Sequence, residues 1–132
     1  MPGPFFDTNV VLYLVGSDPA KAGQAEVLLA GGGTVSVQVL NEFASVASRK
    51  QRMPWPEIED TLATLRSICR VEPLTVEGHE AAVRLARDHR FSSYDAMIVA
   101  SALLADCDTL YSEDLQHSRR IDGRLTIKNP FL

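Results

Sequence analysis

Short apolar runs alternate with segments of helical spacing along this chain. The first run ends at Phe6, the polar residues Asp7, Thr8 and Asn9 follow, and apolar positions with helical spacing begin at Val10. This order predicts a strand, a polar corner and a helix. The same patterns predict strands near residues 34–36, 71–74, 109–112 and 125–128, and helices near 10–15, 21–30, 37–50, 57–69, 75–88 and 92–102.

Strands that alternate with helices are typical of an α/β fold with a parallel sheet. In such sheets the ligand site lies beyond the carboxyl ends of the strands, and the first strand usually borders the point where strand order reverses. Asp7 comes directly after the first predicted strand. We therefore expect the Asp7 carboxylate in a functional site, and acidic residues that follow other strands become its candidate partners.

The composition is that of a globular protein. With 132 residues, 45% of them hydrophobic and 23% charged, the chain suits one domain, residues 1–132, whose core needs no disulfide or metal. Its apolar stretches are too short or too interrupted to cross a bilayer, and no basic segment followed by an apolar one opens the sequence. We expect a cytoplasmic protein that does not bind a membrane.

The net charge of −4 argues against a protein that holds nucleic acid on a broad basic surface. It does not exclude nucleic acid as a substrate. Acidic residues that converge on divalent cations would account for part of the negative charge, because each bound ion returns two positive charges.

Three further acidic residues are expected at the same end of the sheet as Asp7. Glu42 lies near the start of the helix that follows the second strand, although a lone glutamate on a helix is usually a solvated residue. Asp95 lies in the first turn of an almost wholly apolar helix, where it either caps the helix or faces a cleft. Asp114, with Glu113 before it, follows the strand near residues 109–112.

Carboxylates gathered at one place repel each other, and a hard cation removes this repulsion. Oxygen ligands suit Mg²⁺ or Mn²⁺. Such an ion lowers the pKa of a bound water and orients it for attack on a phosphodiester. The residues by themselves therefore point to metal-assisted phosphodiester hydrolysis.

Four short motifs in this order and spacing resemble the PIN domain. They are Phe-Asp-Thr-Asn-Val at 6–10, Asn-Glu-Phe at 41–43, Ser-Tyr-Asp-Ala at 93–96 and Tyr-Ser-Glu-Asp-Leu at 111–115. A short chain of this kind is similar to a VapC-type toxin of a toxin-antitoxin pair. The resemblance implies an α/β, three-layer fold in which helices flank a central, mainly parallel sheet of about five short strands.

The resemblance also implies a site and an activity. The catalytic and metal-binding set would be Asp7, Glu42, Asp95 and Asp114. Ser112 would be an auxiliary residue that helps to orient metal, water or substrate, and Glu113 is the alternative to Asp114 as the fourth acid. The implied function is a Mg²⁺- or Mn²⁺-dependent endoribonuclease that forms a homodimer and is neutralised by a cognate antitoxin protein.

Other functions remain open at this point. A catalytically silent PIN-like module that binds RNA or a protein would be favoured if one of the acids were lost, and none is lost. A phosphatase of the haloacid-dehalogenase type needs a second aspartate two positions after the first, and Asn9 stands there. Four basic residues late in the chain either guide RNA to the acids or form a solvated face; they are Arg119, Arg120, Arg124 and Lys128.

Overall fold

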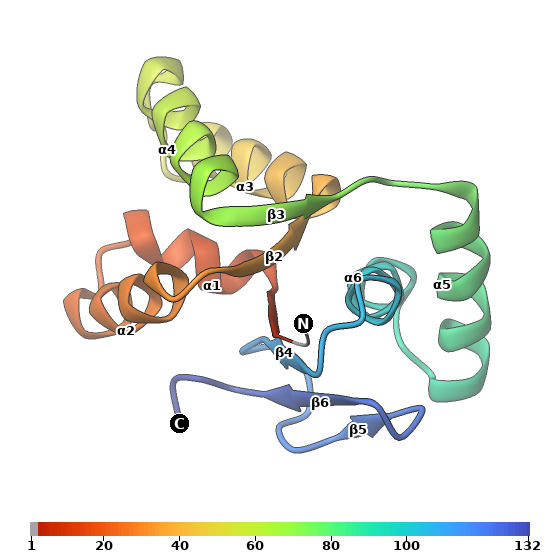
Figure 1. The fold of residues 1–132 in the computed structure, drawn as a ribbon. Helices are drawn as coiled ribbons and strands as arrows, with labels where there is room; N and C mark the ends of the chain where they lie inside the picture. The colour runs from red at the N-terminus through yellow and green to blue at the C-terminus, as the bar shows by residue number, and fades with distance from the viewer. Residues whose placement is uncertain (1–2) are drawn as a thin grey trace.

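The computed structural model describes residues 3–132 and contains a sheet whose strand order is β3-β2-β1-β4-β6-β5 (Figure 1). All neighbouring strands run parallel except β5 and β6, which are antiparallel. The expected α/β fold with a mainly parallel sheet is confirmed, with six strands in the described residues against about five expected. The strands are β1 Pro4–Phe6, β2 Gly33–Ser36, β3 Cys69–Glu72, β4 Thr109–Tyr111, β5 Arg120–Ile121 and β6 Leu125–Lys128.

Helices cover both faces of the sheet. In Figure 1, α1 to α4 lie on one side, and α6 lies on the other side between the sheet and α5. This arrangement gives the three layers expected from the sequence. The helices are α1 Thr8–Leu12, the 3-10 helix η1 Tyr13–Val15, α2 Pro19–Ala30, α3 Val37–Arg49, α4 Trp55–Ile68, α5 Val76–His89 and α6 Ser93–Leu104.

The sequence pattern missed β5 and displaced β3. A strand of two residues, Arg120–Ile121, is too short to carry a hydrophobic alternation, and its pairing with β6 alone defines it. The third strand begins at Cys69 because its ladder with β2 begins there, opposite Gly33. Pro73 lies beyond the strand, since proline has no N–H to donate to the ladder.

The strand register positions the residues that follow β1 and β4. β1 lies between β2 and β4, so the strand order reverses beside it. Phe6 pairs with Tyr111, and their rings stack with centroids 5.9 Å apart. The next residues, Asp7 and Ser112, therefore leave neighbouring strands at the same level.

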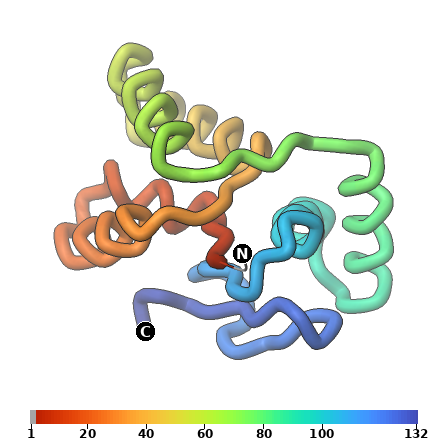
Figure 2. The backbone as a smooth tube through the Cα atoms, in the orientation of Figure 1, coloured from red at the N-terminus to blue at the C-terminus, as the bar shows by residue number. Residues whose placement is uncertain are grey.

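The core is built from the inner faces of the sheet and the helices. Its largest fully buried side chains include Phe5, Phe6, Phe43, Leu110 and Ile127. The C-terminal segment returns beneath α2 (Figure 2). None of the helices within residues 3–132 combines the length and apolar character that crossing a bilayer requires.

Candidate functional site

A cleft of about 170 Å³ lies beyond the carboxyl end of β1. It brings together all four acids that the motifs selected, which come from the ends of β1 and β4, the first half of α3 and the first turn of α6. The lining residues are Asp7, Thr8, Asn9, Leu12, Glu42, Val46, Tyr94, Asp95, Ile98 and Asp114. The four acids therefore lie together at this end of the sheet, as the sequence predicts.

Asp7 is the buried centre of this cleft. It is the N-cap of α1, and its Oδ1 accepts a 2.7 Å hydrogen bond from the backbone N–H of Thr8. Its Oδ2 accepts a 2.8 Å hydrogen bond from the Ser112 hydroxyl. Only 7% of Asp7 is exposed, so these donors replace the water that would otherwise solvate the carboxylate.

Burial raises the pKa of Asp7 from 3.8 to about 6. The hydrogen bonds from Ser112 and Thr8 lower this pKa, and the negative charges of Glu42 and Asp95 raise it further. The site therefore disfavours a third negative charge at Asp7 unless a positive charge is close by.

Asn9 connects the first and the last acid of the set. Its Nδ2 donates to Oδ2 of Asp114 at 3.1 Å and to Oδ2 of Asp7 at 3.4 Å. Its Oδ1 accepts a 3.1 Å hydrogen bond from the backbone N–H of Glu113. This amide fixes the turn after β4 against the start of α1. The sequence indicated only that Asn9 is not a second aspartate, and the contacts give it a positioning role.

Glu42 is held by the residue one helical turn before it. The Nε2 of Gln38 donates to Oε1 of Glu42 at 2.9 Å and to the backbone carbonyl of Tyr94 at 3.2 Å. Gln38 therefore links α3 to the first turn of α6, where Asp95 lies half-buried. Sequence reasoning missed Gln38, and its spacing of four residues from Glu42 was the available signal.

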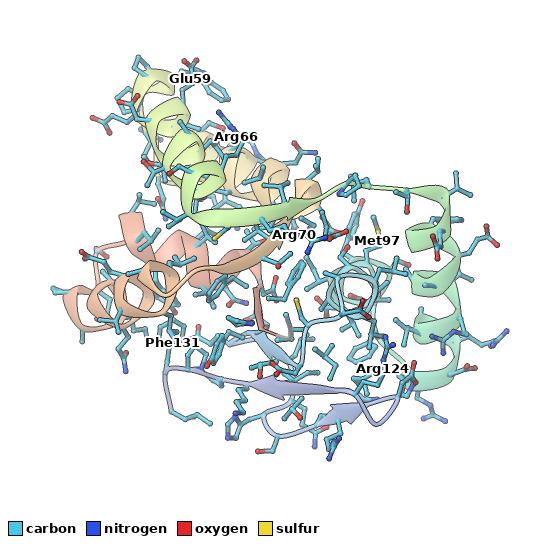
Figure 3. The ribbon with its side chains drawn as sticks, in the orientation of Figure 1. Glu59, Arg66, Arg70, Met97, Arg124 and Phe131 are labelled. Atoms are coloured by element: carbon cyan, nitrogen blue, oxygen red, sulfur yellow. The ribbon has the colours of Figure 1, made fainter. Side chains whose placement is uncertain are left out.

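Of the two acids after β4, Asp114 lines the cleft and Glu113 does not. The Glu113 carboxylate accepts hydrogen bonds from Nζ of Lys21 at 2.8 Å and from the hydroxyl of Tyr13 at 2.7 Å. These partners hold the pKa of Glu113 below its usual range. Phe131 packs edge-on against Tyr13, which ties the C-terminal segment to the same cluster (Figure 3).

A family model for the PIN domain matches residues 5–122 of this sequence. The chain belongs to the PIN domain family. That match spans every residue of the cleft, from Asp7 to Asp114. Among curated proteins, none gives a significant sequence match.

Solved structures with the fold of this PIN domain include toxins of bacterial toxin-antitoxin systems. VapC20 of Mycobacterium tuberculosis, described as a toxin that cleaves the sarcin-ricin loop, is 24% identical with a TM-score of 0.69, covering 85% of this chain and 90% of its own. A toxin-antitoxin complex from Klebsiella pneumoniae is 20% identical with a TM-score of 0.74, and the match covers 97% of this chain and 98% of that one. VapBC2 from Rickettsia felis, bound to a promoter DNA fragment, is 17% identical with a TM-score of 0.68, and the match covers 96% of this chain and 97% of that one.

The donor set of the PIN domain cleft fits a hard divalent cation. All four acidic side chains supply oxygen, and burial together with the charges of Glu42 and Asp95 raises the pKa of Asp7, a cost that a bound cation would offset. Thr8 also lines the cleft and is 6% exposed, and its buried hydroxyl has no hydrogen-bond partner among the described residues. As the side chains stand in residues 3–132, no three Asp, Glu, His or Cys form a closed metal-ligand group. Mg²⁺ in proteins usually keeps several of its waters, so it does not require a closed set of protein ligands.

The basic residues late in the PIN domain are mostly bonded to the protein itself. Arg119, Arg120 and Arg124 each donate a hydrogen bond to a backbone carbonyl. Arg124 reaches the carbonyl of Leu103 at the C-terminal end of α6 (Figure 3), whereas Asp95 lies at the other end of that helix. Arg124 therefore lies away from the acids of the cleft, and a role for it in guiding RNA stays a prediction. Lys128 is exposed at the carboxyl end of β6 and remains a candidate for that role.

A larger cleft of about 570 Å³ lies between the β3–α5 connection and α6. Leu74, Val76, Met97 and Leu104 line it, and Figure 3 labels Met97 there. Its lining includes acidic residues from the β3–α5 segment, but none of the four acids that the motifs selected. The four acids selected by the motifs therefore belong to the smaller cleft.

Proposed function

We propose that this PIN domain is a Mg²⁺- or Mn²⁺-dependent endoribonuclease toxin that hydrolyses RNA phosphodiester bonds and is neutralised by a cognate antitoxin. One observation carries the proposal. Four carboxylates from four separate segments line one cleft, and the most buried of them, Asp7, has a pKa raised to about 6 by burial and by its acidic neighbours. Carboxylates with a raised pKa that gather in a cleft are typical of functional sites.

Each residue of the site has a defined part in the proposal. Asp7, Glu42, Asp95 and Asp114 would hold the ion, which supplies a polarised water for attack on phosphorus and charge stabilisation at the phosphate. Ser112 keeps Asp7 ionised and oriented by donating to its Oδ2. Asn9 sets the separation of Asp7 and Asp114 through one amide group.

The proposal of an antitoxin partner rests on the structural relatives. The Klebsiella structure is a toxin-antitoxin complex, and the Rickettsia structure is VapBC2 on promoter DNA. We also propose that this chain forms a homodimer and acts in the cytoplasm as one domain over residues 1–132. Size-exclusion chromatography with light scattering tests the dimer, and co-expression with the protein encoded next to its gene tests neutralisation.

The activity is tested by incubating the purified chain with a panel of structured RNAs, with Mg²⁺, with Mn²⁺ and with a chelator. Asp7→Asn and Asp95→Asn remove one acid each from the cleft. Asp106→Asn is the matched control, because Asp106 is exposed, lies after the C-terminal end of α6 and has the positive φ of 57° that asparagine tolerates. Circular dichroism verifies that each variant is folded.

Discrete cleavage that needs the metal, persists in Asp106→Asn and disappears in both cleft variants supports the proposal. Cleavage that persists with chelator, or in folded Asp7→Asn and Asp95→Asn, would overturn it. A wild type that binds RNA or a partner protein but cuts nothing across the panel indicates the catalytically silent binding module instead.

A further inference from the structure

An exposed aromatic ring stands at the rim of the acidic cleft. Tyr94 lines the same cleft as Asp7 and directly precedes Asp95, and 72% of Tyr94 is exposed. Trp55, the other large aromatic residue among the strongly exposed positions of residues 3–132, begins α4 and does not line this cleft. An aromatic ring is thus held in solvent beside the group of acids.

The fold does not account for this ring. The other two tyrosines are packed against the protein, Tyr111 by stacking on Phe6 and Tyr13 by its contacts with Glu113 and Phe131. Tyr94 instead contacts α3 through its backbone carbonyl. A ring left in water forfeits the apolar burial that normally justifies a large aromatic residue.

The backbone that carries the ring is nevertheless fixed. The carbonyl of Tyr94 accepts the Gln38 amide, and the same amide group donates to Glu42. The hydroxyl of Ser92 caps the helix by accepting from the backbone N–H of Asp95 at 3.2 Å. Tyr94 is therefore anchored on both sides at a constant position relative to two acids of the cleft, which suits a rigid contact surface.

We propose that the Tyr94 ring stacks on a nucleobase of unpaired RNA next to the phosphate that is cut. Every base has a π face, so an exposed ring binds it without regard to base identity, and an aromatic platform of this kind suits single-stranded RNA. A base inside a helix is already stacked and paired, which keeps it from the ring. Tyr94 thereby selects loops and single strands as the substrate class. This inference rests on the proposed ribonuclease function.

The test uses the RNA that the wild type cuts, shortened to a single strand that spans the cleavage site. Steady-state cleavage is measured for wild type, Tyr94→Phe, which keeps the ring, and Tyr94→Leu, which removes it. Trp55→Leu is the control for loss of an exposed aromatic residue elsewhere. We expect Tyr94→Leu to lower kcat/KM about five- to a hundredfold, mainly through KM, while Tyr94→Phe and Trp55→Leu stay near wild type.

A second arm replaces one nucleotide at a time around the cut by an abasic residue, which keeps the phosphate. At one abasic position, the kcat/KM of the wild type should fall to that of Tyr94→Leu, whereas the kcat/KM of Tyr94→Leu should be unchanged by the missing base. Stacking is overturned if Tyr94→Leu cleaves intact RNA as efficiently as the wild type. It is also overturned if cleavage by Tyr94→Leu is lower than that of the wild type by the same factor on every abasic strand. Either result would indicate that the ring contacts a protein and not the RNA. If the wild type cuts no RNA, the proposed function fails first and the stacking inference with it.

Discussion

The hydroxyl of Ser112 donates a 2.8 Å hydrogen bond to the carboxylate of Asp7, across 105 positions of sequence. Both atoms are buried, and the bond joins the residue after β4 to the residue after β1. A hydrogen bond to the charged form of a carboxyl stabilises that form. Ser112 therefore lowers the pKa of Asp7 and offsets part of the rise that burial causes.

Ser112→Ala should raise the pKa of Asp7 above about 6, because the bond that favours its ionised form is lost. The acidic limb of the pH profile of cleavage should move to higher pH, and the free energy of unfolding near pH 7 should fall by about 2 kcal/mol. Ser67→Ala removes an exposed hydroxyl on α4 that bonds only within its helix and should change neither. An unmoved acidic limb in Ser112→Ala would contradict this role.

Asp7 should make the protein less stable as the pH rises, in the absence of metal. The folded state holds the Asp7 proton up to about pH 6 and the unfolded state only to about 3.8, so the folded state binds more protons between these values. The free energy of unfolding therefore falls across this window by roughly 3 kcal/mol and changes no further above it.

Asp7→Asn cannot ionise and should lack this fall. Urea unfolding with chelator at several pH values from about 3 to 8 measures the difference between wild type and variant. We expect the free energy of unfolding of the variant to rise relative to that of the wild type from about pH 4 to 6. At neutral pH, Mg²⁺ should stabilise only the wild type. Parallel stability curves for the two proteins would show that Asp7 has an ordinary pKa.

The two neighbouring acids after β4 should behave differently. Asp114→Asn should lower cleavage by about a hundredfold, because Asp114 lines the cleft and would hold the ion. Glu113→Gln should leave cleavage near wild type and lower the thermal midpoint, because its carboxylate bonds to Lys21 and Tyr13. RNA cleavage and thermal unfolding of both variants give the comparison. The reverse pattern would identify Glu113 as the fourth acid.

Gly33 should not tolerate a side chain. Its φ is 153°, and a Cβ placed there would lie 2.5 Å from a ring atom of Phe6 and 2.8 Å from the carbonyl oxygen of Pro4. Gly33→Ala should therefore cost about 3 kcal/mol of unfolding free energy.

Gly23→Ala is the matched substitution. Gly23 lies inside α2, and a Cβ added there would meet no atom within 4 Å, so alanine should stabilise the protein by about 0.5–1 kcal/mol. Chemical denaturation measures both changes. A Gly33→Ala variant as stable as wild type would show that β1 and β2 can separate without cost.

The motifs of the sequence are sufficient to select the four acids that line the cleft. Asp7 and Asp114 follow strands, and residues that follow parallel strands share one edge of the sheet whatever their separation in sequence. The same polarity puts Asp106 and Asp108, which precede β4, at the opposite edge, where the N–H of Asp108 donates to the carbonyl of Gly3 before β1. Strand direction, which the periodic pattern supplies, was sufficient for these predictions.

The chain's sequence by itself determined the order of the elements, the parallel sheet and the end of the sheet that carries the acids, because hydrophobic period and chain direction are local properties. Only the tertiary structure decided that Glu113 turns to Lys21 while Asp114 lines the cleft. It alone also brought Gln38 to Glu42 and Tyr94. Side-chain hydrogen bonds between separate elements depend on strand register and helix placement, which no stretch of sequence contains.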